Sequence, residues 1–151
     1  MKYLHTMIRT SNLEKTLNFY INILGMIEVN RYESKEARFT LIFICAPADI
    51  NKINFREAPL IEITYNWPDK EGKYENLVSG RSFGHIAFSV DNIYIFCEKL
   101  IQKKVIINRP PRDGYMAFIK SPEDISIELL QKGHPLEIKD PWKSMENIGN
   151  W

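Results

Sequence analysis

The sequence contains a loose internal repeat, and this repeat limits the folds that the chain can adopt. His5 has a counterpart in His85, and Asn12, seven residues after His5, has a counterpart in Asn92. Each asparagine is followed by an aliphatic residue and lies at the start of a segment with apolar residues at helical spacing. A repeat of this kind indicates two copies of one supersecondary unit.

We expect one helix near the start of each copy. The first is predicted to begin with a capping box formed by Ser11 and Glu14 and to end at Gly25, because glycine readily adopts the left-handed conformation that ends a helix. The second is predicted to be opened by Asp91. Both segments have one apolar face, which is suited to covering a sheet.

Strand-like segments precede and follow each helix, so each half has the order βαβββ. The segments after the helices are 26–31, 38–45 and 60–66 in the first half, and 105–108, 115–119 and 126–130 in the second. We therefore predict an α+β fold in a single domain, 1–151. Its parts are module 1 (about 3–67), a charged linker (68–80), module 2 (about 81–131) and a C-terminal tail (132–151) without a clear period.

The composition excludes several classes of function. Twenty basic and nineteen acidic residues leave a formal charge of +1, so no broad field favours nucleic acid or an anionic membrane. No apolar run approaches the ~18 residues that span a bilayer, and the N-terminus lacks a signal-peptide core. These features predict a cytoplasmic location. Cys45 and Cys97 lie in apolar stretches without a CxxC motif and are predicted to be buried thiols.

Four strands each carry one potential metal ligand. Because side chains alternate along a strand, His5 shares a face with Arg9, and Glu62 shares a face with Asn66. The four candidate ligands are His5, Glu62, His85 and Glu128. Burial of four such groups on apolar strands is costly, and a divalent cation would compensate for it.

The type of ligand does not choose among zinc, nickel, cobalt, iron and manganese. A single strand histidine is more often a satisfied core residue, and a single strand glutamate more often faces solvent. The recurrence of both in two modules is what favours a metal site.

The sequence resembles the glyoxalase I (lactoylglutathione lyase) family of the vicinal oxygen chelate superfamily, which includes the glyoxalase/bleomycin resistance fold. The resemblance covers about residues 3 to 131 and is carried by short blocks. These blocks are Leu4-His5-Thr6-Met7-Ile8-Arg9, Leu17-Asn18-Phe19-Tyr20, Leu24-Gly25-Met26, Phe39-Thr40-Leu41, Glu62-Ile63-Thr64-Tyr65-Asn66-Trp67, Phe83-Gly84-His85-Ile86-Ala87 and Ile127-Glu128-Leu129. In that family the metal ligands fall on the same four residues.

The resemblance also implies a substrate, the hemithioacetal of methylglyoxal and glutathione, with glutathione as co-substrate. Arg9 and Asn66 would hold the γ-glutamyl end of glutathione, and a guanidinium suits its carboxylate. Arg81 matches a further glutathione-contacting arginine, and Arg112 could hold the glycine carboxylate. The family's usual Asp-Pro-Asp-Gly-Tyr is replaced at 121–125, which leaves open whether the thiol is glutathione or a related one.

The family reaction transfers a proton between adjacent carbons, so it needs a Lewis acid and a base. By resemblance Glu128 is the principal catalytic base, and Glu62 could assist at the opposite face. One divalent metal ion is expected per site, with nickel favoured over zinc or cobalt because the chain lacks the long extensions of the zinc-type enzymes. The resemblance further implies a homodimer with metal sites at the subunit interface. His5 and Glu62 would come from one chain, and His85 and Glu128 from the other.

Two alternatives to glyoxalase I stay open, because one fold hosts several functions. Another vicinal oxygen chelate enzyme, such as an acyl-CoA epimerase, would perform a similar proton transfer. A metal-free small-molecule-binding module would not need four ligands. Ring-cleaving dioxygenases and fosfomycin-inactivating enzymes use two histidines and one glutamate, so the additional Glu62 argues against them.

Overall fold

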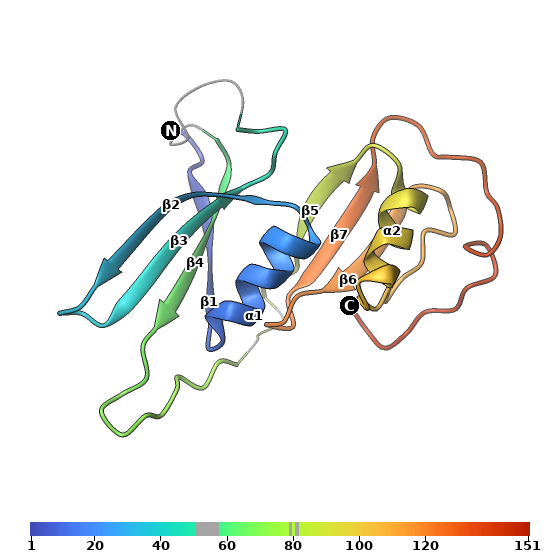
Figure 1. Cartoon of the computed structure of the whole chain (residues 1–151). Helices are drawn as coiled ribbons and strands as arrows, with labels where there is room; N and C mark the ends of the chain where they lie inside the picture. Colours follow the sequence, from blue (N-terminus) through green and yellow to red (C-terminus); the bar gives the residue numbers. More distant parts are fainter. Residues whose placement is uncertain (51–57, 79, 81) are drawn as a thin grey trace. The chain divides into compact units, whose positions relative to one another are not determined.

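The computed structural model describes residues 1–50, 58–78, 80 and 82–151 (Figure 1). The chain divides into two compact units, Met1–Val78 and Ser79–Trp151, and each is described by itself. The boundary falls inside the predicted linker 68–80. No helix within the described residues has the length and apolar character that crossing a bilayer requires.

The first unit contains a four-stranded sheet with the order β1-β4-β3-β2. Its strands are β1 (His5–Thr10), β2 (Ile27–Ser34), β3 (Phe39–Cys45) and β4 (Leu60–Asn66). β1 and β4 are parallel, whereas β4 pairs with β3, and β3 with β2, in the antiparallel sense. Fully buried isoleucines from the two central strands, Ile42, Ile44 and Ile63, form part of its core.

The predicted helix of the first unit has two parts, α1 (Leu13–Leu17) and the π-helix η1 (Asn18–Ile23). Its N-cap is Asn12, whose side chain accepts a hydrogen bond from the Lys15 amide at 3.0 Å. The predicted capping box at Ser11 is therefore wrong. The helix begins one residue later than predicted. The Asn12 amide donates to the Thr10 hydroxyl at the end of β1, and this contact holds Asn12 at the N-cap position. Gly25, with a φ of +82°, ends the helix as predicted.

The second unit contains a three-stranded sheet with the order β5-β7-β6 and one helix (Figure 1). Its elements are β5 (His85–Val90), α2 (Ile93–Gln102), β6 (Met116–Lys120) and β7 (Ser126–Gln131). β5 and β7 are parallel, as β1 and β4 are in the first unit. Asn92 caps α2 by accepting from the Ile95 amide, so the cap predicted at Asp91 is also displaced by one residue.

The strand predicted at 105–108 does not form. In its place, Arg109 makes an isolated bridge to Phe118 of β6. On the side toward 105–108, the Asn108 carbonyl accepts from the Ile148 amide of the C-terminal tail at 2.9 Å, so it does not pair with β6. The α+β prediction of two β-rich modules is otherwise confirmed.

The tail 132–151, for which the sequence predicts no structure, packs onto the second unit. Trp142 is 1% exposed, and its ring stacks on Tyr94 with centroids 5.8 Å apart. The Leu136 amide donates to the Gly114 carbonyl at 3.0 Å. A side chain at Gly114 would place its Cβ 2.2 Å from the Leu136 carbonyl oxygen, so this close approach requires glycine.

The two cysteines are buried free thiols, as the sequence predicts. Burial, together with the nearby Glu98 carboxylate, raises the pKa of Cys97 to about 12. The thiolate form needed for disulfide exchange or metal binding is therefore strongly disfavoured at neutral pH.

Asp113 fastens the turn that leads into β6. One carboxylate oxygen accepts from the amides of Tyr115 and Met116, and the other accepts from Arg109 Nη2 at 2.8 Å. Partial burial opposes ionisation, but these hydrogen bonds outweigh it and lower the pKa of Asp113 below its ordinary 3.8.

We expect Asp113→Asn to lower the free energy of unfolding by about 1 kcal/mol at pH 7 in urea titrations, because it turns the Arg109 contact into two opposed donors. A group with a lowered folded-state pKa stabilises the fold above its ordinary pKa and loses that contribution as the pH falls through the lowered value. The difference from the wild type should therefore be complete above pH 3.8 and disappear only when the pH falls below the lowered pKa of Asp113. Arg109→Gln is the matched control, and a double variant whose cost equals the sum of the single costs would contradict this coupling.

Candidate metal centre

Adjacent parallel strands place His5 and Glu62 on one face of the first sheet. The Cα partner of Glu62 on β1 is Met7, two residues after His5, so the two side chains point the same way. His5 Nε2 lies 3.2 Å from Glu62 Oε2. Glu62 also accepts a hydrogen bond from the Thr64 hydroxyl at 3.1 Å, which helps to fix the carboxylate.

The second unit repeats this arrangement with His85 and Glu128. Ala87, two residues after His85, is the Cα partner of Glu128 on the parallel pair β5 and β7. His85 Nε2 lies 3.1 Å from Glu128 Oε2. The exposed fraction is 14% for both glutamate side chains, and 37% and 44% for His5 and His85. In both pairs the carboxylate is therefore mostly shielded while the imidazole reaches solvent.

Each pair also contacts a phenylalanine that the sequence analysis did not single out. Phe43 is the Cα partner of Glu62, and its ring meets the His5 ring edge-on at 5.9 Å. Phe118 is the Cα partner of Glu128 and meets the His85 ring edge-on at 5.6 Å. The phenylalanine lies 19 residues before the glutamate in the first module and 10 residues before it in the second, so sequence spacing alone does not reveal this third repeated residue.

The two pairs fit a divalent cation by chemistry and by spacing. Two atoms bound about 2.1 Å from one ion are separated by about 3.0 Å in octahedral and 3.4 Å in tetrahedral geometry. The imidazole–carboxylate distances of 3.1 and 3.2 Å lie in this range. Among the described residues, no lysine or arginine forms an ion pair with Glu62 or Glu128. The shielded carboxylates thus lack a permanent cationic partner in that part of the chain.

Neither unit provides a complete set of ligands. Within residues 1–50, 58–78, 80 and 82–151, no group of three or more histidine, cysteine, aspartate or glutamate side chains converges on a common point. Each unit contributes one histidine and one glutamate. The assignment of all four residues to one metal site stays a prediction.

The predicted substrate residues of the first unit meet at an additional carboxylate. Asn66 Nδ2 donates to Glu75 Oε2 at 2.7 Å, and Arg9 Nε lies 4.0 Å from Glu75 Oε1. Glu75 belongs to the segment 68–80 that the sequence predicts to be an exposed linker, and for this reason it was missed. Its contact with two predicted site residues makes it part of the candidate site.

The other two predicted substrate residues are not brought to this cluster. Arg81 lies outside the described residues. Arg112 donates from Nη1 to the Met145 carbonyl at 2.9 Å and so holds the C-terminal tail. Contacts of Arg81 and Arg112 with substrate stay predictions.

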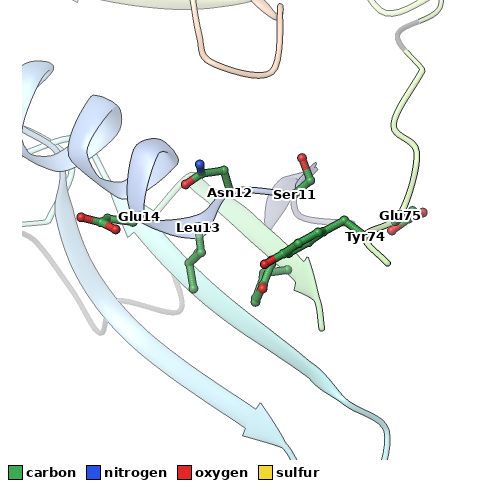
Figure 2. A pocket seen from close by; sticks show the side chains of 7 residues that line it. Ser11, Asn12, Leu13, Glu14, Tyr74 and Glu75 are labelled. Atoms are coloured by element: carbon green, nitrogen blue, oxygen red, sulfur yellow. The ribbon is translucent and has the colours of Figure 1, made fainter. Parts of the chain in front are cut away.

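A pocket of about 560 Å³ lies beside Glu75 in the first unit. Figure 2 shows the Tyr74 ring reaching across it toward Leu13, with Glu75 on one side and Glu14 pointing away on the other. The residues that line it are Ser11, Asn12, Leu13, Glu14, Tyr65, Tyr74 and Glu75.

Two β-rich units, each with a histidine and a glutamate on adjacent parallel strands, define a protein of the vicinal oxygen chelate class. The chain belongs to the Glyoxalase/Bleomycin resistance protein/Dioxygenase superfamily, whose family model matches residues 2–141. This result confirms the family-level resemblance seen in the sequence blocks.

Within this superfamily, the chain is similar to enzymes of one named activity. The chain is 37% identical over 137 residues to a lactoylglutathione lyase of Neisseria meningitidis, covering 87% of this chain and 91% of the relative. It is 33% identical over 152 residues to a lactoylglutathione lyase of Salmonella typhimurium, covering 97% and 100%. Among solved structures, the trypanothione-dependent glyoxalase I of Leishmania major superposes with a TM-score of 0.71 at 28% identity, covering 87% of this chain and 86% of that one.

Proposed function

We propose that this chain is a glyoxalase I, a lactoylglutathione lyase that isomerises the hemithioacetal of methylglyoxal and glutathione to S-lactoylglutathione. The observation that carries the proposal is the histidine–glutamate pair at equivalent places in both units, each with its atoms 3.1–3.2 Å apart. The lactoylglutathione lyases among the relatives, which the chain matches over most of their length, support the same activity.

We propose that His5, Glu62, His85 and Glu128 together hold one divalent metal ion, with nickel as the first choice and zinc or cobalt as alternatives. When bound, the ion supplies Lewis acidity at the two adjacent oxygens of the substrate. The mixed set of imidazole and carboxylate ligands suits all three ions, and it offers no thiolate that would select a softer metal.

Glu128 is proposed to move the proton. Its carboxylate takes the proton from the carbon that bears the sulfur and returns it to the neighbouring carbon, while the hydroxyl proton passes to the neighbouring oxygen, so that an α-hydroxyketone becomes an α-hydroxythioester. The shielding of Glu128, which is 14% exposed, limits exchange of that proton with water. Glu62 has the same shielding and the same histidine partner, so it is placed to assist at the opposite face.

The full site is proposed to form in a homodimer. Each unit presents only two ligands, and a two-fold axis would bring His5 and Glu62 of one protomer to His85 and Glu128 of the other. We also propose a cytoplasmic location, because both cysteines are free thiols, as expected in a reducing compartment.

Metal removal and reconstitution test this function. Dialysis against a chelator is expected to abolish the conversion of the glutathione hemithioacetal, and nickel, cobalt or zinc should restore it at one ion per site, which elemental analysis would measure. Full activity without bound metal would overturn the proposal. A reconstituted protein that is inactive on the hemithioacetal but exchanges the α-hydrogen of an acyl-CoA would identify an epimerase. Lack of stoichiometric metal and of both activities would indicate a binding module.

A further inference from the structure

We propose that Glu75 determines the specificity of the thiol site by binding the ammonium group of an α-amino acid, while Arg9 binds the carboxylate on the same carbon. The inference rests on the proposed function, because it takes Arg9 and Asn66 as residues that bind the thiol. It adds a recognition residue from the segment 68–80, which the sequence predicts to be a linker.

The contacts of Glu75 leave hydrogen-bond donors of Arg9 on one side and acceptor oxygens of Glu75 and Asn66 on the other. Asn66 turns its amide nitrogen toward Glu75 at 2.7 Å, so its oxygen stays available as an acceptor. Arg9 Nε lies 4.0 Å from Glu75, which is too far for a hydrogen bond. Among the described residues, the terminal nitrogens of Arg9 have no hydrogen-bond partner. Arg9, Asn66 and Glu75 thus offer the terminal guanidinium nitrogens of Arg9 as donors on one side and the oxygens of Glu75 and Asn66 as acceptors on the other.

The pocket beside Glu75 favours a cation. Its lining contains the Glu75 carboxylate and two tyrosine rings, Tyr65 and Tyr74, but no lysine or arginine, and the second lining carboxylate, Glu14, points away. Carboxylates attract an ammonium group directly, and aromatic faces attract it through their quadrupole. Glu75 is the carboxylate that also reaches Asn66, so it joins this pocket to the anion-binding guanidinium.

An α-amino acid zwitterion matches this arrangement because it carries both charges on one carbon. The γ-glutamyl end of glutathione ends in such a group. A thiol without the ammonium would leave Glu75 only its contacts with Asn66 and Arg9, and a thiol without the carboxylate would not engage the terminal nitrogens of Arg9. The affinity lost on removal of the ammonium should therefore depend on Glu75, and the affinity lost on removal of the carboxylate should depend on Arg9.

The test compares wild type, Glu75→Gln and Arg9→Ala with three thiols: glutathione, glutaryl-cysteinylglycine, which lacks the ammonium, and 4-aminobutyryl-cysteinylglycine, which lacks the carboxylate. Glu75→Gln is expected to raise KM for the glutathione hemithioacetal about three- to tenfold with kcat unchanged, and to leave KM for the glutaryl thiol unchanged. Arg9→Ala should raise KM for the hemithioacetals of glutathione and of the glutaryl thiol, and it should leave KM for the aminobutyryl thiol unchanged. Glu14→Gln is the matched control, because Glu14 lines the same pocket but points away from it, and it should change each KM less than twofold.

Calorimetry with the S-hexyl derivatives of the same three thiols measures binding without turnover. If Glu75→Gln weakens the glutathione and glutaryl derivatives equally, or weakens neither, the role of Glu75 is refuted. Should the wild type turn over none of the hemithioacetals yet bind S-hexylglutathione in a Glu75-dependent way, the proposed function fails and the recognition site stands. The wild type alone also tests the proposal. If it binds the glutathione and glutaryl derivatives equally well, the ammonium group is not recognised and the role of Glu75 is refuted.

Discussion

Glu128→Gln is expected to lower kcat by about 10²- to 10⁴-fold at saturating metal, which is the usual contribution of a general base. Glutamine keeps the shape of the side chain and an oxygen donor, but it cannot accept the proton. Glu128 is the group proposed to move that proton, and in the structure its partner is the imidazole of His85 at 3.1 Å. Steady-state kinetics, together with the metal content of the same sample, separate loss of the base from loss of the ion.

Glu62→Gln is the matched control for Glu128→Gln. Glu62 has the same exposed fraction and an equivalent histidine, so the variant should disturb the metal about equally. We expect a smaller decrease in kcat, because Glu62 is proposed only to assist. If Glu128→Gln retains full metal and nearly unchanged kcat while Glu62→Gln is inactive, the base is Glu62.

Mixing two inactive variants is expected to restore activity. His5→Ala and His85→Ala should each lose the metal site, because each removes one of two imidazole ligands. If one protomer supplies His5 and its partner supplies His85, a heterodimer of the two variants has one site with both changes and one intact site. Random exchange of subunits makes about half of the dimers mixed, so about a quarter of wild-type activity should return.

The control for this mixing experiment is a variant that carries both substitutions. Mixed with His5→Ala under the same exchange conditions, it should restore nothing, because no combination of these two chains contains an intact site. Sedimentation of the mixture would verify that dimers are present. If the mixture of single variants stays inactive although mixed dimers form, all four ligands come from one chain.

The face that carries the proposed metal ligands could be predicted from the sequence because strand geometry is simple. Alternation places His5, Met7 and Arg9 on the exposed face of β1 and Ile8 on the buried one, and this prediction is confirmed. The recurrence of histidine and glutamate then indicated the pairs that the structure brings within 3.2 Å. The alternation of side chains along a strand was sufficient for this prediction, because it depends on no other part of the chain.

The failures occur where the outcome depends on neighbours. Serine, aspartate and asparagine can all cap a helix. Asn12 is the cap of the first helix because its amide is bound to Thr10 at the end of the preceding strand. The tail has no periodic pattern because its anchors, such as Trp142 on Tyr94, are individual tertiary contacts. Glu75 was missed for a similar reason, since a charged residue in a linker has no periodicity to reveal what it contacts.

The placement of the ligands on strands limits how the length of this chain can change. Inserting or deleting one residue in β4 before Glu62 would turn this proposed ligand to the opposite face, where Ile61 and Ile63 are buried. The same holds for β7 before Glu128, where Ile127 and Leu129 are buried. A gain or loss of two residues would restore the face but displace the ligand along the strand by about 6.6 Å. Length variation compatible with metal binding is thus confined to the connections between strands, and segment 68–78 can vary only as far as Glu75 still reaches Asn66.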